Sequence, residues 1–182
     1  MLGLVFSEFM DIVEESFPDD VYDALLETAE EQCESKGAYT SVGHYDHLEM
    51  VTLITALSEK TGIPLAELIR VAGNHLFKRF HQRYPDFFNG VDDAFDFLRG
   101  IEDRIHFEVR KLYPHAELPY FEYTEPSENE LVLTYQSKRP FAHLAWGLIE
   151  GCITHFDQSI SVAYKDLSDG AWTRASFHLR RD

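Results

Sequence analysis

The sequence predicts an α+β fold, in which a layer of helices is followed by a four-stranded antiparallel sheet with one inserted helix. Three observations support this prediction. Apolar residues recur at helical spacing through residues 1–115, and short alternating segments replace them in residues 116–182. No internal repeat or linker divides the 182 residues, 45% of which are hydrophobic. We therefore expect a single domain over residues 1–182, built around one sizeable core.

The helical part has recognisable start and stop signals. Asp46 is a suitable N-cap for one apolar stripe, and Gly62 is a suitable end for it. Pro64 can open the next helix, and Pro114 stops the last one. Five helices are expected in this part, over residues of about 4–17, 21–29, 46–62, 65–84 and 91–112.

The remaining residues alternate like strands. Turn-forming residues over Glu125–Asn129 and Ser168–Gly170 indicate two hairpin-like connections. Apolar residues at helical spacing between them indicate one helix, over about Phe141–Asp157. Four strands are expected, over residues of about 119–123, 131–137, 160–164 and 172–179.

The composition excludes several classes of function. The formal net charge is −16, from 32 acidic and 16 basic side chains, so a phosphate backbone or an anionic membrane would be repelled. The N-terminal residues have no basic leader or cleavage site, and no apolar run is long enough to span a bilayer. We therefore expect a cytoplasmic protein. Its two cysteines are too few for a disulfide scaffold.

One strand carries a polar motif that is suited to binding carboxylates. In an extended strand Tyr135, Ser137 and Arg139 project from one face, and they offer two hydroxyls and a guanidinium. The two propionates of haem need such groups, and Leu131 and Leu133 on the same face would suit the porphyrin edge. The alternative is a polar strand end with an arginine at the surface.

His106 is the candidate for an axial iron ligand. On a helical wheel the core stripe contains Ala94, Leu98, Ile101, Ile105 and Leu112. His106 lies roughly 90° from the centre of that stripe, where it can face a cavity beside the helix. A neutral imidazole is a standard ligand of haem iron. The alternative is a surface or capping histidine.

Several short stretches together resemble one known family. They are Met1–Phe6, Tyr84-Pro85, Phe95–Leu98, His106 with Arg110–Pro114, Leu118-Pro119, Tyr135-x-Ser137-x-Arg139 and Gly147–Gly151. In these the chain resembles the haem-nitric oxide/oxygen-binding (H-NOX) domain family over nearly its whole length. The resemblance implies a haem b between the helical layer and the sheet, with His106 as the proximal ligand. It also implies that Tyr135, Ser137 and Arg139 hold the propionates and that Pro119 presses on the porphyrin.

The distal side of the implied haem is apolar. Members of the family that hold oxygen are similar in carrying a tyrosine five residues after the motif arginine, and this chain has Leu144 there. By the same resemblance the remaining distal residues are Val5, Phe9, Leu76 and Phe80. Bound oxygen gains from a hydrogen-bond donor, whereas nitric oxide on ferrous haem needs little such help. The residues therefore favour a sensor of nitric oxide, with carbon monoxide as a further ligand.

The expected function is sensing without catalysis. The chain ends about forty residues after the propionate motif, so we expect its output to pass to a separate protein. The bacterial branch of the family implies a histidine kinase or a cyclic-di-GMP enzyme, that is, a diguanylate cyclase or phosphodiesterase. The rival functions are an oxygen sensor, a haem-dependent oxidase or peroxidase, and a haem-free interaction module. An apolar distal side lacks the acid-base group that an oxidase or peroxidase needs.

Overall fold

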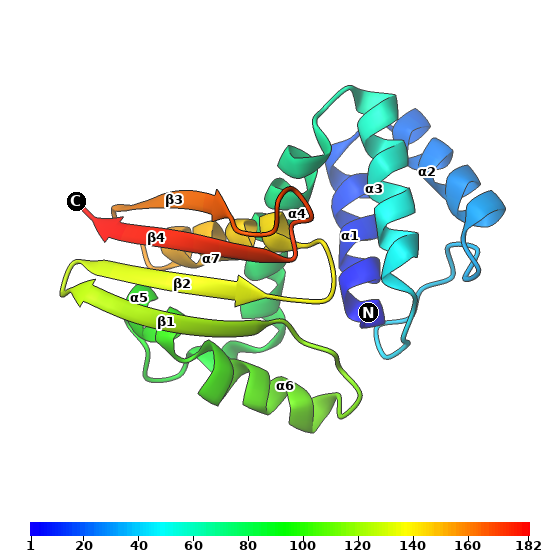
Figure 1. The fold of residues 1–182 in the computed structure, drawn as a ribbon. Helices are drawn as coiled ribbons and strands as arrows, with labels where there is room; N and C mark the ends of the chain where they lie inside the picture. The colour runs from blue at the N-terminus through cyan, green and yellow to red at the C-terminus, as the bar shows by residue number, and fades with distance from the viewer. The chain divides into compact units, whose positions relative to one another are not determined.

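The predicted α+β fold class is confirmed by a computed structural model that describes all residues, Met1–Asp182 (Figure 1). The helices are α1 (Gly3–Ser16), α2 (Asp19–Gln32), α3 (His47–Thr61), α4 (Leu65–Arg83), α5 (Ala94–Arg99), α6 (Phe107–Leu112) and α7 (Ala142–His155). The strands are β1 (Tyr120–Ser127), β2 (Glu130–Gln136), β3 (Ile160–Asp166) and β4 (Arg174–Arg181). A 3₁₀ turn, η1 (Pro85–Phe88), and a π-helical turn, η2 (Ile101–His106), complete the list. No helix combines the length and apolar composition that crossing a bilayer requires.

The chain divides into two units, Met1–Ala72 and Gly73–Asp182. Secondary structure changes from helical to mixed where the sequence predicts it, near residue 116. The division into units falls earlier, within α4, so the helices after Ala72 belong with the sheet. The single domain over residues 1–182 remains a prediction.

The first unit is helical, and its helix α3 begins and ends where the sequence predicts. Asp46 caps α3 by accepting a hydrogen bond from the Leu48 N–H (3.0 Å). Gly62 ends the same helix in a left-handed conformation, with φ of 73°. Phe9, one of the predicted distal residues, is buried in α1, and Val5 is half-buried there.

The second unit is built on an antiparallel sheet with the strand order β1-β2-β4-β3. In Figure 1, α7 lies behind the strands and covers one face of the sheet. Successive residues of β2 point to opposite faces of the sheet, and Leu131, Leu133 and Tyr135 point into the core. Phe177 of β4 pairs with Leu133 and is also fully buried. Both faces of the sheet are therefore fixed by the apolar alternation.

Glycines permit the close packing of α4 against α7. A Cβ at Gly151 would lie 2.7 Å from the Cβ of Phe77, and one at Gly73 would lie 2.4 Å from the Leu144 carbonyl oxygen. Those separations are too short for carbon and oxygen atoms, so only glycine fits. Gly151 on α7 and Gly73 on α4 therefore both allow the close approach of these helices.

The predicted helix over residues 91–112 is wrong in its interior. A π-helical turn over Ile101–His106 separates α5 from α6, and the Ile105 N–H donates to the Gly100 carbonyl five residues earlier (3.1 Å). The turn absorbs one extra residue, which rotates everything after it by about 100° relative to a continuous α-helix. Leu112, which the wheel places in the core, is therefore 53% exposed.

The first hairpin is also tighter than predicted. β1 continues to Ser127 with an irregular register after Thr124, so the turn between β1 and β2 is shorter than Glu125–Asn129. β2 ends at Gln136, before the last two residues of the motif. Ser137 and Arg139 therefore do not extend the face of the strand, and the argument that placed them on it is wrong.

Asp93 ties the N-terminus of α5 to the C-terminal strand. Its carboxylate accepts from the Asp96 N–H (3.1 Å), from Gln158 Nε2 (2.9 Å) and from the Arg181 guanidinium (2.6 and 2.7 Å). Burial raises the pKa of Asp93. The hydrogen bonds from Gln158 and the backbone and the Arg181 charge lower it by more, so the pKa of Asp93 lies below its ordinary value. The ionised carboxylate is thus the form that stabilises the fold.

Replacing Asp93 by Asn should lower the free energy of unfolding at neutral pH by about 2 kcal/mol, because charged hydrogen bonds are lost. A lowered folded-state pKa stabilises above the ordinary aspartate pKa, and this contribution disappears as the pH falls through the folded value. Urea unfolding from pH 7 to pH 3 should therefore show the two proteins converging in acid. Asp92→Asn, at the exposed neighbouring position, is the control. A constant difference at every pH would contradict the role of the charge.

Candidate functional site

His106 is a buried histidine whose ring is oriented by a carboxylate. It ends the π-helical turn, is 8% exposed, and its Nδ1 lies 2.8 Å from Oε1 of Glu102. Burial lowers the pKa of His106, and Glu102 offsets only part of this, so the ring favours the neutral form. With Nδ1–H donated to Glu102, Nε2 carries the lone pair that can bind a metal.

Glu102 joins the histidine to the edge of the sheet. Its Oε1 accepts a second hydrogen bond from the Phe121 N–H of β1 (3.0 Å). Its Oε2 lies 3.4 Å from the Arg110 guanidinium on α6. One carboxylate therefore links the turn that carries His106, the following helix and the first strand. Its position four residues before His106 was the sequence signal that could have found it.

An aromatic side chain connects His106 with the polar motif. The Phe121 ring lies 6.0 Å from the His106 ring and 5.5 Å from the Tyr135 ring, measured between centroids. Phe121 projects from β1 and Tyr135 from its neighbour β2, where the two residues are paired. The structure thus brings together two sequence-predicted site residues, His106 and Tyr135, through a residue that the sequence analysis missed.

The three motif residues meet at the end of β2 by bending of the backbone. The Arg139 N–H donates to the Ser137 hydroxyl oxygen (3.0 Å), and the Ser137 N–H donates to the Thr173 carbonyl (2.8 Å). Burial raises the pKa of Tyr135, and the Ser137 hydrogen bond and the Arg139 charge lower it only partly. Tyr135 is therefore a neutral phenol that can donate a hydrogen bond.

Arg139 already binds a carboxylate. Its guanidinium forms an ion pair with the side chain of Glu117 and also donates to the Glu117 carbonyl oxygen (3.2 Å). The arginine side chain is 16% exposed, whereas the glutamate side chain is 72% exposed. A largely buried guanidinium with an exposed, replaceable partner is suited to an incoming carboxylate. Pro119 follows two residues later, half-buried, just before β1 begins.

Two tyrosines fix the helix that follows His106. The hydroxyl of Tyr84, at the end of α4, lies 2.9 Å from that of Tyr113, at the end of α6. Burial, with the Tyr113 hydrogen bond, raises the pKa of Tyr84 to about 12. Tyr84 is therefore a neutral phenol at physiological pH, and its hydrogen bond with Tyr113 holds the far end of α6.

Three predicted distal residues lie on helices that contact each other. Leu76 is buried and Phe80 half-buried on α4, and Leu144 is half-buried on α7. The close approach at Gly73 involves the backbone of Leu144 itself. The other two, Val5 and Phe9, belong to the first unit. None of the five offers a side-chain hydrogen-bond donor.

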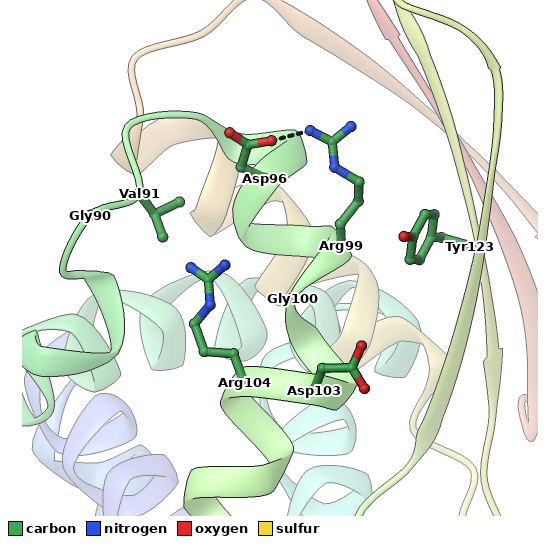
Figure 2. A pocket seen from close by; sticks show the side chains of 8 residues that line it. All are labelled: Gly90, Val91, Asp96, Arg99, Gly100, Asp103, Arg104 and Tyr123. Carbon is green, nitrogen blue, oxygen red and sulfur yellow. Dashed lines mark hydrogen bonds and ion pairs between the residues drawn. The ribbon is translucent and has the colours of Figure 1, made fainter.

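A separate pocket of about 530 Å³ opens beside the turn that carries His106 (Figure 2). Figure 2 shows Val91 on one side of the view and Tyr123 of β1 on the other, with Arg104 and Arg99 between them. It is lined by Gly90, Val91, Asp96, Arg99, Gly100, Asp103, Arg104 and Tyr123. The lining is open and charged and contains none of the predicted site residues, so it does not suit an apolar macrocycle.

Solved structures resemble the chain over its full length. The H-NOX protein from K. algicida, in the Fe(II) unliganded form, is 34% identical, with a TM-score of 0.91 and coverage of 100% of this chain and 97% of that one. The H-NOX protein from Shewanella woodyi, bound to IWP-051 in the Fe(II)CO state, is 40% identical, with a TM-score of 0.83 and coverage of 100% and 95%. The H-NOX protein from S. oneidensis in the Fe(II)NO state is 25% identical, with a TM-score of 0.88 and coverage of 100% and 99%.

Sequence comparison gives the same family. The soluble guanylate cyclase gcy-33 of Caenorhabditis elegans is 30% identical over 142 residues, which are 76% of this chain. The chain spans 14% of the length of that relative. The family profile described as Haem-NO-binding matches residues 2–164. The chain therefore belongs to the Haem-NO-binding (H-NOX) family of haem-based gas-sensor domains.

Proposed function

We propose that this chain is a haem-based sensor of nitric oxide that signals to a separate protein. The observation that carries the proposal is the Glu102–His106 pair, since it leaves Nε2 of a buried, neutral imidazole available as an iron ligand. A histidine oriented by a carboxylate is the usual arrangement at metal centres. Membership of the family supports haem as the cofactor.

The remaining site residues fit the propionate side of a haem b. Arg139 is already engaged with one carboxylate, and Tyr135 and Ser137 supply hydroxyls beside it. A propionate would replace Glu117 on the guanidinium, and Pro119 would rest against the macrocycle. When bound, haem supplies a ferrous iron that takes up a diatomic gas.

The distal side chains would discriminate among gases because they lack a hydrogen-bond donor. Leu144, Leu76 and Phe80, with Val5 and Phe9 of the first unit, are apolar and present no donor. Apolar side chains give no extra stabilisation to oxygen, which gains from a hydrogen bond, and they do not penalise nitric oxide or carbon monoxide. It also supplies no acid-base group, which supports sensing rather than oxidase or peroxidase activity.

The route by which His106 would affect the protein surface passes through Glu102. Since the same carboxylate oxygen holds His106 and the Phe121 N–H, displacement of the imidazole pulls on β1 or breaks this link. Either change alters the edge of the sheet, and a partner with different affinities for the two states would read it. We propose that the partner is a histidine kinase, a diguanylate cyclase or a cyclic-di-GMP phosphodiesterase.

Absorbance spectroscopy of the reduced protein tests the proposed ligand. Nitric oxide should change the Soret band at once, whereas air should give either no change or oxidation. Leu144→Tyr introduces a hydrogen-bond donor on α7 and should raise the oxygen affinity. Leu144→Phe, which adds the same bulk without a hydroxyl, is the matched control. Reversible, long-lived oxygen uptake by the unaltered protein would contradict the nitric oxide assignment.

A further inference from the structure

The outer face of the sheet, opposite α7, is largely polar. Its residues follow from the register, because Lys165 pairs with Ser176 and Ala163 pairs with His178 across β3 and β4. Ser161, Ala163 and Ser176 are short, so the longer side chains stand clear of them. The strands lie in front of α7 in Figure 1, with β3 and β4 adjacent.

Basic side chains gather on the β3–β4 half of this face. Arg174, His178 and Arg180 alternate along β4 on the same side, and Lys165 lies beside them on β3. All four are exposed. We call these four residues the basic stripe. It carries three of the 16 Lys and Arg side chains of a protein whose formal net charge is −16. The charge of the stripe is therefore opposite in sign to that of the whole molecule.

The positive charges of the stripe are not neutralised by ion pairs. None of its four side chains forms an ion pair in the structure, whereas other arginines, such as Arg99 and Arg181, are paired with carboxylates. Acidic residues of this face lie at one end of the stripe: Glu130 is opposite Arg180 and also accepts from the Ser127 hydroxyl (3.4 Å), and Asp182 follows Arg180 by two residues. Arg174 and Lys165, at the other end, have no acidic residue opposite them, so that end of the surface is positive.

We propose that the basic stripe is a docking surface for an acidic segment of a partner protein. From Arg174 to Arg180 it extends about 20 Å along β4, at about 3.3 Å per residue. A segment that presents carboxylates over that length would pair with it at each basic residue. The surface needs no haem, so the inference goes beyond the proposed gas-sensing function and holds for the haem-free chain.

The size of the stripe favours a protein over other polyanions. A nucleic acid or an anionic bilayer extends well beyond 20 Å, so it would also meet the acidic remainder of the molecule within about a Debye length of 8–10 Å. Apart from the His178 imidazole, the basic half of the face also has no aromatic side chain on which a base could stack. A protein can confine its carboxylates to a matching strip.

A second copy of the chain is the main competing occupant. Helix α2 carries a row of acidic residues, including Asp19, Asp23, Glu27 and Glu31 at four-residue spacing. The row is about 18 Å long, at 1.5 Å per residue, and could also match the stripe. Such a contact would join two different surfaces and continue from copy to copy, which favours open chains over a closed oligomer.

Fluorescence anisotropy with a labelled twelve-residue peptide that contains six glutamates tests the proposal. Lys165→Glu/Arg174→Glu should weaken its binding roughly tenfold or more at low salt, and added salt should weaken binding to the unaltered protein. Lys36→Glu/Lys78→Glu is the matched control, because those two exposed lysines lie elsewhere and the change in net charge is the same. The neutral pair Lys165→Gln/Arg174→Gln should give an intermediate loss and guards against misfolding of the reversed variant.

Three results would overturn the proposal. One is equal peptide binding by the stripe variant and the control variant. Another is binding of a twelve-nucleotide single strand or of phosphatidylserine vesicles, through the same residues, as tight as that of the peptide. The third is salt-sensitive self-association in sedimentation velocity that Lys165→Glu/Arg174→Glu abolishes, which would assign the stripe to α2 of a second copy. The haem-free and haem-loaded proteins are tested alike, so failure here is distinguishable from failure of the gas-sensing proposal.

Discussion

His106→Gly is expected to lower haem affinity by roughly a hundredfold or more, since loss of a group that merely orients a metal ligand commonly costs ten- to a hundredfold. The imidazole is the one buried, carboxylate-oriented nitrogen donor among the proposed site residues, and glycine leaves space in its place. Added imidazole should enter that space and restore the ferrous spectrum. The measurement is the ratio of Soret to protein absorbance during purification, followed by titration with imidazole.

His115→Gly is the control for this substitution, because His115 is exposed in the turn after α6. Circular dichroism should show that both variants retain their helices. An unchanged spectrum in His106→Gly, with full haem content, would refute the ligand assignment.

Glu102→Ala is expected to lower the haem affinity ten- to a hundredfold, because the carboxylate fixes both the tautomer and the orientation of His106. It also removes the acceptor of the Phe121 N–H, so the link between η2 and β1 is lost. A less basic imidazole binds iron more weakly, so the iron–histidine stretching band in resonance Raman spectra should move to lower frequency. Haem transfer to apomyoglobin gives the accompanying loss of affinity.

Two further variants separate orientation from general destabilisation. Glu102→Gln keeps an acceptor for Nδ1–H but removes the charge, so its Raman shift should be intermediate. Glu108→Ala removes a partly exposed carboxylate that is paired with Lys111 on α6, and it should change neither measurement. A Glu102→Ala protein with reduced stability but an unchanged stretching frequency would show that Glu102 is only structural.

His106 and Glu102 also show how much of the site could be predicted from the sequence. The type of His106 and its distance from the motif predicted its importance, and its burial is consistent with that prediction. Glu102 was missed although its position four residues before His106 places the two side chains on one face of a continuous α-helix as well. The exposure of Leu112 was missed because the segment was interpreted as a continuous α-helix. Within that segment the π-helical turn changes which residues share a face. No periodicity in the sequence marks such a turn, since it depends on what packs against the helix.

The sequence by itself determined the features that depend on neighbouring residues. Asp46 and Gly62 mark the two ends of α3, because capping is a local hydrogen-bond and backbone preference. The alternation of Leu131, Leu133 and Tyr135 determined the inner face of β2 because the side-chain period of a strand is fixed. The family resemblance, which rests on short motifs, is confirmed by the matching profile.

Only the tertiary structure decided which groups from distant segments meet. The pairing of Arg139 with Glu117, of Tyr84 with Tyr113 and of Glu102 with the Phe121 N–H joins residues 19 to 29 positions apart. The basic stripe likewise exists only once β3 and β4 pair in register. Such contacts are selected by the packing of whole elements, in which burial and register are settled together, and local propensity carries no information about them.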